Sequence, residues 1–275
     1  MRSSRARSRL ASLSLALAAV CLAASGAYAA DAEPAAAGKY VALGDSYAVA
    51  PGTREYDNPD DPCRRGPSTY PRLWAQQHPS YSFVEASCSG ATTADLTGQQ
   101  VPQLTADTTL VTVHVGGNDV GFVEVLKNCI LTIDDKDCIA GVEAAKAAAT
   151  SSLPGALAST YAAIRAKAPN AKVVVVGYPR LYTIGGTCGI LGLSDRERTA
   201  LNSGSDTLDS VLASEAGKAG FTFLDPRTAF DPHTICSKGQ AWVTSLEWDK
   251  INESYHPNKA GHGEGYLPLL NAITG

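Results

Sequence analysis

Five short β-favouring runs recur along the chain, each separated from the next by a longer stretch. They span Tyr40–Leu43, Tyr81–Glu85, Thr109–Val115, Lys172–Val176 and Phe221–Leu224. The fourth is an unbroken series of valines after its lysine, which is typical of a strand covered on both faces. Strands that alternate with helices predict a parallel sheet with right-handed crossovers. We therefore expect one three-layer α/β/α domain whose five parallel strands lie in the flavodoxin-like order 2-1-3-4-5.

Helical patterns and long loops fill the spaces between these runs. Helices are expected over Ser68–Gln77 and over Cys138–Lys167, the second broken near Pro154-Gly155. Ser194 and Glu197 match a capping box, and Pro257 suits the first turn of the last helix. The walls of a crevice at the sheet edge are expected from three loops, Pro51–Pro67, Gly177–Leu193 and Asp225–Ser245.

Residues with catalytic potential follow the first and third runs. The first run stops at Gly44-Asp45-Ser46, and the third leads into Gly116-Gly117-Asn118. In the order 2-1-3-4-5 the switch point lies between these two strands, where open α/β sheets bind their ligands. A serine hydroxyl needs an adjacent base to act as a nucleophile, and His256 near the C-terminus could supply it. The arrangement indicates a serine hydrolase.

The same residue types also have ordinary structural uses. Ser46 could cap a helix, and Asp45 and Asp119 suit turns better than catalysis. The remaining histidines are expected in other places: His114 hydrogen-bonded inside the sheet, His262 at a helix–sheet contact, His78 exposed and His233 in a wall loop. The chain has no Gly-x-Ser-x-Gly elbow, His-Glu-x-x-His motif or P-loop, which argues against an ordinary α/β-hydrolase lipase, a zinc protease and a nucleotide-binding site.

From Tyr40 to about Tyr266, the chain resembles the GDSL, or SGNH, hydrolase family. The four signature residues of that family would be Ser46, Gly90, Asn118 and His256. The resemblance implies that Ser46 is the nucleophile and His256 the base. It also implies an oxyanion hole made of the Ser46 and Gly90 backbone N–H groups and the Asn118 side-chain amide. With its cysteines included, the chain looks most like secreted actinomycete lipases and phospholipases of this family.

The group that orients His256 is the point where the sequence departs from the family. Many members carry an aspartate three residues before the histidine, and this chain has Glu253 there. Some secreted actinomycete members use a main-chain carbonyl instead. Because glutamate is one methylene longer than aspartate, we favour the Ser254 carbonyl, with Glu253 as the rival and partly solvated.

Apart from Cys21, the chain has six cysteines, and an even number in an exported protein is typical of disulfides. Six cysteines allow 15 connectivities. All six are expected in loops near one rim of the sheet. The resemblance to secreted lipases implies the sequential pairs Cys63–Cys88, Cys129–Cys138 and Cys188–Cys236, which would join neighbouring loops. A zinc site is a poor alternative because no Cys-x-x-Cys occurs.

The first residues have the pattern of a secretory signal peptide. Arginines precede an apolar stretch from Leu10 to Ala24, and Ala27-Tyr28-Ala29 fits a cleavage site. The apolar stretch is shorter than the ~20 residues of a spanning helix. We therefore expect a signal peptide over residues 1–29, a disordered tether over 30–38, a hydrolase domain over 39–275, and a secreted product.

Together these features predict a secreted carboxylic-ester hydrolase (a lipase or esterase, with a phospholipase as a special case) that needs no cofactor or metal. We expect a monomer that acts on a small-molecule or lipid ester, with at most transient contact with lipid surfaces. A net charge of -4 without a basic run argues against nucleic-acid binding. One alternative is a carbohydrate O-acetyl esterase, although 7% aromatic residues offer no obvious sugar-stacking platform. The other is a binding module on an inactive hydrolase fold.

Overall fold

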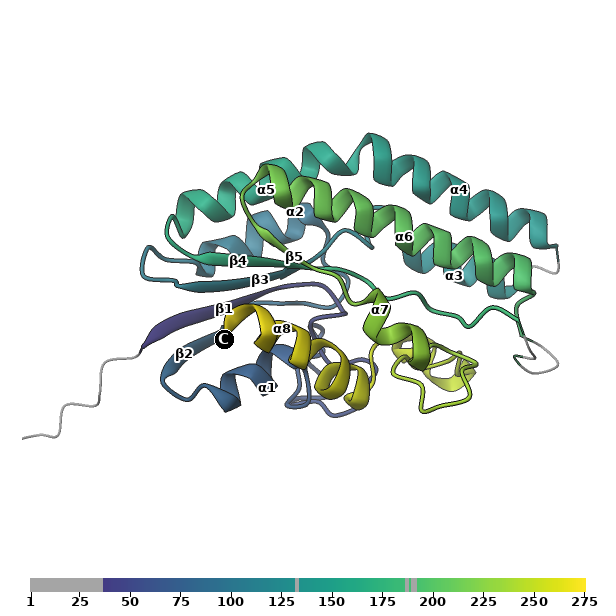
Figure 1. The fold of residues 1–275 in the computed structure, drawn as a ribbon, viewed down its shortest axis with the longest axis horizontal. Helices are drawn as coiled ribbons and strands as arrows, with labels where there is room; N and C mark the ends of the chain where they lie inside the picture. Colours follow the sequence, from purple (N-terminus) through teal and green to yellow (C-terminus); the bar gives the residue numbers. More distant parts are fainter. Residues whose placement is uncertain (1–36, 132–133, 186–187, 189–191) are drawn as a thin grey trace, which may run out of the picture. The chain divides into compact units, whose positions relative to one another are not determined.

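A single parallel sheet organises the chain in the computed structural model, which describes residues 37–131, 134–185, 188 and 192–275. The strand order is β2-β1-β3-β4-β5, and every neighbouring pair is parallel (Figure 1). The strands are β1 Gly38–Gly44, β2 Tyr81–Glu85, β3 Leu110–His114, β4 Lys172–Val176 and β5 Thr222–Leu224. The predicted fold and order are confirmed, with small shifts at strand ends. The predicted signal peptide and most of the tether lie outside the described residues.

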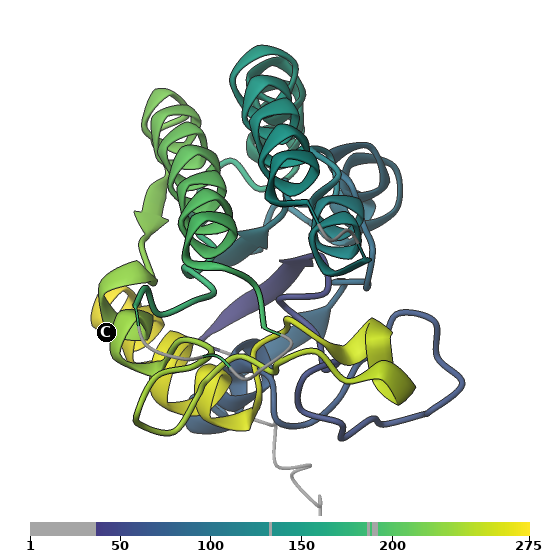
Figure 2. The same cartoon turned by 90° about the vertical axis from the view of Figure 1, so that its right-hand side faces the viewer.

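Helices cover both faces of this sheet, as Figures 1 and 2 show from two directions. One face carries α2 Thr93–Asp95, α3 Phe122–Leu131, α4 Asp135–Ser151, α5 Leu153–Lys167 and α6 Asp195–Lys218. The other carries α1 Tyr70–Gln77 and α8 Leu267–Thr274, with α7 Arg227–Phe230 beside them. Short 3-10 or π-helical segments span Leu96–Gln100, Val101–Gln103, Asp231–His233, Trp248–Glu253 and Gly261–Tyr266.

Strand β1 shows how the sequence pattern builds the two halves of the core. Tyr40 and Ala42 belong to one buried cluster, and Val41 and Leu43 belong to the other. Side chains alternate across a strand, so a run that is apolar at every position must be covered on both faces. The polar turn after β1 is therefore held in place by the buried strand that it follows.

Most predicted helices are confirmed, although several begin at other residues than expected. The Ser194 capping box closes as predicted, with Ser194 and Glu197 exchanging both hydrogen bonds. The Ala-rich segment breaks at Ser152, just before the proline. Pro257 does not open the last helix: it pairs with Val243 in an isolated bridge. Asn258 takes the capping role instead, because its side chain accepts the Gly261 N–H at 3.0 Å.

Three disulfides tie the periphery to this framework, namely Cys63–Cys88, Cys129–Cys138 and Cys188–Cys236. These are the pairs that the family resemblance implies. The expectation that all six cysteines lie in loops is wrong, since Cys129 is in α3 and Cys138 is in α4. Their bridge therefore clamps two helices together. Within the described residues no helix has both the length and the apolar character needed to cross a membrane.

Candidate active site

The turn after β1 presents Ser46 at the carboxyl edge of the sheet. The Asp45 N–H donates to the carbonyl of His114 at 2.8 Å, which ties the end of β1 to the end of β3. One Asp45 carboxylate oxygen accepts the Tyr47 N–H at 2.9 Å, and the other accepts the Tyr178 hydroxyl at 2.5 Å. Burial raises the pKa of Asp45 to about 7 despite these bonds. Asp45 thus shapes the turn, as its sequence context predicts.

Ser46 and His256 lie within hydrogen-bonding distance. The Ser46 Oγ is 2.8 Å from His256 Nε2, and His256 Nδ1 is 2.8 Å from the carbonyl oxygen of Ser254. A carbonyl can only accept, so Nδ1 carries the ring proton and Nε2 is free to accept from the hydroxyl. Burial lowers the pKa of His256 to about 4, so the ring is neutral at pH 7. The pair has the geometry of an activated nucleophile and its base.

The Glu253 side chain interacts with groups other than the His256 ring. Its carboxylate accepts the Tyr56 hydroxyl at 2.7 Å and lies 3.4 Å from the Arg54 guanidinium. Its side chain is only 15% exposed, so it is more enclosed than the sequence suggested. Both nitrogens of His256 are occupied by Ser46 and Ser254, which leaves none for Glu253.

Gly90 and Asn118 border the same cavity as Ser46. Gly90 has φ +81°, a conformation that side-chain-bearing residues rarely adopt, and a Cβ there would meet no atom within 4 Å. The requirement for glycine is therefore conformational. The Asn118 side-chain amide donates one hydrogen bond to the carbonyl of Ala91 at 3.0 Å. A primary amide has two N–H groups, so the second remains available for a substrate oxygen.

Asp119, which follows this amide, has a structural role. Its carboxylate accepts the backbone N–H of Thr93 at 3.1 Å and the Thr93 hydroxyl at 2.5 Å. Thr93 is the first residue of α2. Asp119 thus holds the start of that helix beside the end of β3.

A cavity of about 300 Å³ opens beside Ser46, and its walls differ from those expected. Of the three predicted wall loops, the first supplies Pro62 and Arg64, the second supplies Tyr178, and the third supplies none of the lining residues. The apolar wall comes instead from α3, through Phe122, Val123, Leu126 and Ile130. Sequence reasoning missed this wall, although the apolar residues of α3 were a visible signal.

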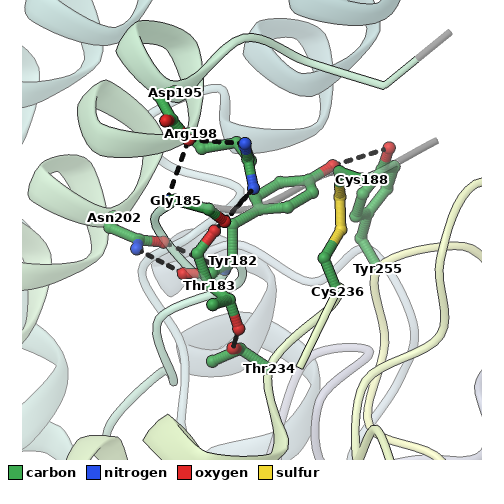
Figure 3. Close-up of a disulfide and its surroundings, with 10 residues drawn as sticks. All are labelled: Tyr182, Thr183, Gly185, Cys188, Asp195, Arg198, Asn202, Thr234, Cys236 and Tyr255. Carbon is green, nitrogen blue, oxygen red and sulfur yellow. Dashed lines mark hydrogen bonds and ion pairs between the residues drawn. A yellow bond between two sulfur atoms is a disulfide. The ribbon is translucent and has the colours of Figure 1, made fainter. Parts of the chain in front are cut away.

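A second layer of contacts fixes the loop that carries His256. Tyr255 has φ +63°, and its carbonyl accepts the Tyr47 hydroxyl at 2.6 Å. The Tyr255 and Tyr182 hydroxyls are 3.1 Å apart, beside the disulfide Cys188–Cys236 (Figure 3). The Asn202 side chain holds the backbone of Tyr182 in turn. Nothing in the local sequence signals these contacts, because they join segments far apart in the chain.

Comparison with known proteins places this geometry in a family. Residues 42–263 match the model of the GDSL-like Lipase/Acylhydrolase family. The chain belongs to this family. It is 46% identical to Lipase 1 of Streptomyces coelicolor over 95% of this chain and 96% of the relative.

Two solved structures resemble this GDSL-family chain over 86% of its length. The crystal structure of phospholipase A1 from Streptomyces albidoflavus NA297 is 48% identical, with a TM-score of 0.82 over 98% of that chain. The extracellular lipase from Streptomyces rimosus is 40% identical, with a TM-score of 0.83 over all of that chain. The predicted family membership is confirmed.

The other histidines of this GDSL hydrolase lie outside the cavity lining. His262 is buried and its Nδ1 accepts the Tyr70 N–H at 3.2 Å, in line with the expected helix contact. His114 is buried as predicted, but within the described residues neither ring nitrogen has a hydrogen-bond partner. His78 is half-buried and stacks on Trp74 rather than lying exposed. His233 stacks on Trp242, away from the cavity.

No group of three or more His, Cys, Asp or Glu side chains in the described part of the chain could hold a metal ion.

Proposed function

We propose that this protein hydrolyses carboxylic esters of lipids, with Ser46 as the nucleophile and His256 as the general base. The observation that carries the proposal is the 2.8 Å contact between Ser46 Oγ and His256 Nε2, in a ring that is neutral at pH 7. His256 takes the proton of Ser46 as the oxygen attacks the ester carbonyl, and then gives it to the leaving alcohol. Water, activated by the same ring, then hydrolyses the acyl-enzyme.

The negative oxygen of each tetrahedral intermediate would be bound by the Ser46 and Gly90 backbone N–H groups and by the Asn118 amide. Each such donor contributes ~3 kcal/mol to transition-state stabilisation. The Ser254 carbonyl would fix the tautomer of His256 and steady the imidazolium that forms. Ser46 and His256 then act as a catalytic dyad, and the main-chain carbonyl of Ser254 holds the His256 ring in place.

The shape of the cavity favours a lipid ester over an acetyl ester. The wall made by α3 is apolar and contains Phe122, Leu126 and Ile130, which offers contact area that an acetyl group would not use. Tyr47, Tyr178 and Tyr255 also line the cavity. We assign the α3 wall to the acyl chain.

We also propose that the enzyme acts outside the cell as a monomer, after removal of residues 1–29. The Streptomyces rimosus relative is described as extracellular, which supports this. Sequencing the N-terminus of the secreted protein should give Ala30 as the first residue. A secreted protein that still carries residues 1–29 would contradict the proposal.

The test of the catalytic proposal compares two serines that line one cavity. Ser46→Ala should abolish hydrolysis of nitrophenyl esters while the circular dichroism spectrum is unchanged. Ser89→Ala removes a hydroxyl from the same cavity and should keep most of the activity. A serine-directed phosphonate should label Ser46 alone. Substantial activity in Ser46→Ala, or labelling at another residue, would refute the assignment.

A further inference from the structure

Two cationic side chains, Arg64 and Lys127, line the cavity that contains Ser46. Asp45 is the acidic residue among the residues that line it. That carboxyl is buried and accepts hydrogen bonds from the Tyr47 N–H and the Tyr178 hydroxyl, so at most one negative charge faces the two cations. The lining therefore has an excess of positive charge beside a catalytic serine.

Arg64 differs from the other arginines in its partners. Within the described residues, every arginine other than Arg64 and Arg165 forms an ion pair with a carboxylate. Arg165 lies on α5, stacks on Phe221 and donates to backbone carbonyls. Arg64 donates to the carbonyl of Pro59 at 3.3 Å and stacks on Tyr56, 4.9 Å from the ring centroid. Among the described residues, therefore, no carboxylate pairs with the Arg64 guanidinium, which has more N–H donors than the one bonded to Pro59.

The backbone at Arg64 is held in an unusual conformation. Its φ is +56°, which a side-chain-bearing residue adopts only when the surroundings require it. The preceding residue, Cys63, is bridged to Cys88, and the Arg64 carbonyl accepts the Ala50 N–H at 2.8 Å. The covalent and hydrogen-bonded contacts fix the main chain from which the Arg64 side chain extends.

Lys127 adds a second positive charge from α3. It pairs with Glu124 at 2.9 Å, but the Glu124 side chain is 77% exposed and well hydrated. Such an exposed pair is weak and is readily exchanged for another anion. The apolar residues of α3 flank Lys127 on the same wall.

We propose that Arg64, assisted by Lys127, binds the phosphate of a glycerophospholipid while its acyl ester lies at Ser46. A guanidinium matches a phosphate with two parallel hydrogen bonds, and a charge-assisted bond is about twice as strong as a neutral one. The enzyme should therefore prefer phospholipids to uncharged esters with the same acyl chains. This inference rests on the proposed ester hydrolysis at Ser46.

The experiment compares lipids that differ only in the headgroup. Phosphatidylcholine and diacylglycerol with identical acyl chains are presented in micelles of an uncharged detergent, and a soluble nitrophenyl ester is the third substrate. Phosphatidylcholine has no net charge, so a general attraction to an anionic surface is avoided. The variants are Arg64→Gln, Arg64→Lys and Lys127→Gln. The control is Arg196→Gln, which removes an arginine whose side chain is 73% exposed.

Arg64→Gln should lower kcat/KM on phosphatidylcholine at least tenfold, mainly through KM, and change the other two substrates less than twofold. Arg64→Lys should recover part of the loss, Lys127→Gln should show a smaller loss, and Arg196→Gln should match the wild type. Equal losses on all three substrates would make Arg64 a structural residue and overturn the inference. An unchanged rate of Arg64→Gln on phosphatidylcholine would also overturn the inference. A loss of rate that appears only when phosphatidylglycerol is used in place of phosphatidylcholine would overturn it as well. A wild-type protein inactive on every ester would refute the proposed function instead.

Discussion

The hydroxyl of Tyr47 donates to the carbonyl of Tyr255 at 2.6 Å. Tyr47 directly follows Ser46, and Tyr255 directly precedes His256. One buried hydrogen bond thus links the loop of the proposed nucleophile to the loop of the proposed base. Tyr255 has φ +63°, so its peptide unit needs such a partner to stay where it is.

Removing the Tyr47 hydroxyl should loosen the contact between Ser46 and His256. We expect Tyr47→Phe to lower kcat about tenfold, because small displacements of a base from its nucleophile are costly. Stability should fall by about 1 kcal/mol for the lost bond. Tyr161→Phe is the matched control, since the Tyr161 hydroxyl is buried and has no hydrogen-bond partner within the described residues. Equal activity of the two variants would show that the Tyr47 bond is not needed.

The pH profile should reveal the buried state of His256. Only the neutral ring can accept the Ser46 proton, and a pKa of about 4 keeps it neutral at far lower pH than an ordinary histidine. With an uncharged ester, kcat/KM should stay flat from about pH 8 to 5 and fall tenfold per pH unit below about pH 4. An acid limb between pH 6 and 7 could belong to Asp45, whose pKa is raised to about 7, and it would then be absent from Asp45→Asn. A limb in that range that remains in Asp45→Asn would contradict the prediction for His256.

Glu253→Gln should cost less than about tenfold in kcat. The imidazole already has its acceptor in the Ser254 carbonyl, and Glu253 bonds to Tyr56 and Arg54. Glu247→Gln is a suitable control, because Glu247 pairs with the same arginine at 2.5 Å. Loss of a true triad acid can lower the rate by ~10⁴-fold through the wrong tautomer. A loss of that size, in Glu253→Gln alone, would make Glu253 the third member of a triad.

Asn118→Ala should lower kcat by roughly 100- to 1000-fold with little change in KM, as expected for one oxyanion donor. The same substitution removes the bond to the Ala91 carbonyl, so the Gly90 loop could also shift. Thermal melting and binding of an unreactive ester analogue would detect such a shift. A change mainly in KM would make Asn118 a substrate-positioning residue.

Phe122→Ala should favour longer acyl chains. Phe122 lies between the main cavity and a second, apolar cavity of about 30 Å³ among α3, α4 and α6, and it lines both. Shortening its side chain should join them. The ratio of kcat/KM for palmitoyl over butyryl esters should then rise severalfold. Val123→Ala is the control because Val123 lines the main cavity only. An unchanged ratio in Phe122→Ala would show that the acyl chain takes another path.

The sheet and the positions of Ser46 and Asn118 could be predicted because they depend on local patterns. Continuous β-branched runs mark buried strands, and the topology rule then places the ends of β1 and β3 together. His256 could be assigned only through a family pattern, since nothing local brings it within reach of Ser46.

The walls of the cavity could not be predicted, for a physical reason. An amphipathic helix such as α3 presents apolar residues, but its pattern does not tell whether they meet a core or an open cavity. The Tyr47–Tyr255 bond joins residues 208 positions apart, so no local pattern encodes it. His114 was expected to be hydrogen-bonded because buried polar groups usually are, but among the described residues neither ring nitrogen has a partner of ordinary geometry.

The disulfides Cys63–Cys88 and Cys129–Cys138 anchor two different walls of one cavity. The first holds the loop that carries Arg64, and the second ties α3 to α4. Each wall is therefore cross-linked to the framework independently of the other and of the loop that presents His256. For protein engineering, this means that each wall can be changed without disturbing the cross-link of the other. Libraries could randomise the Arg64 wall or the α3 wall, keep the local cross-link, and leave Ser46 and His256 unchanged.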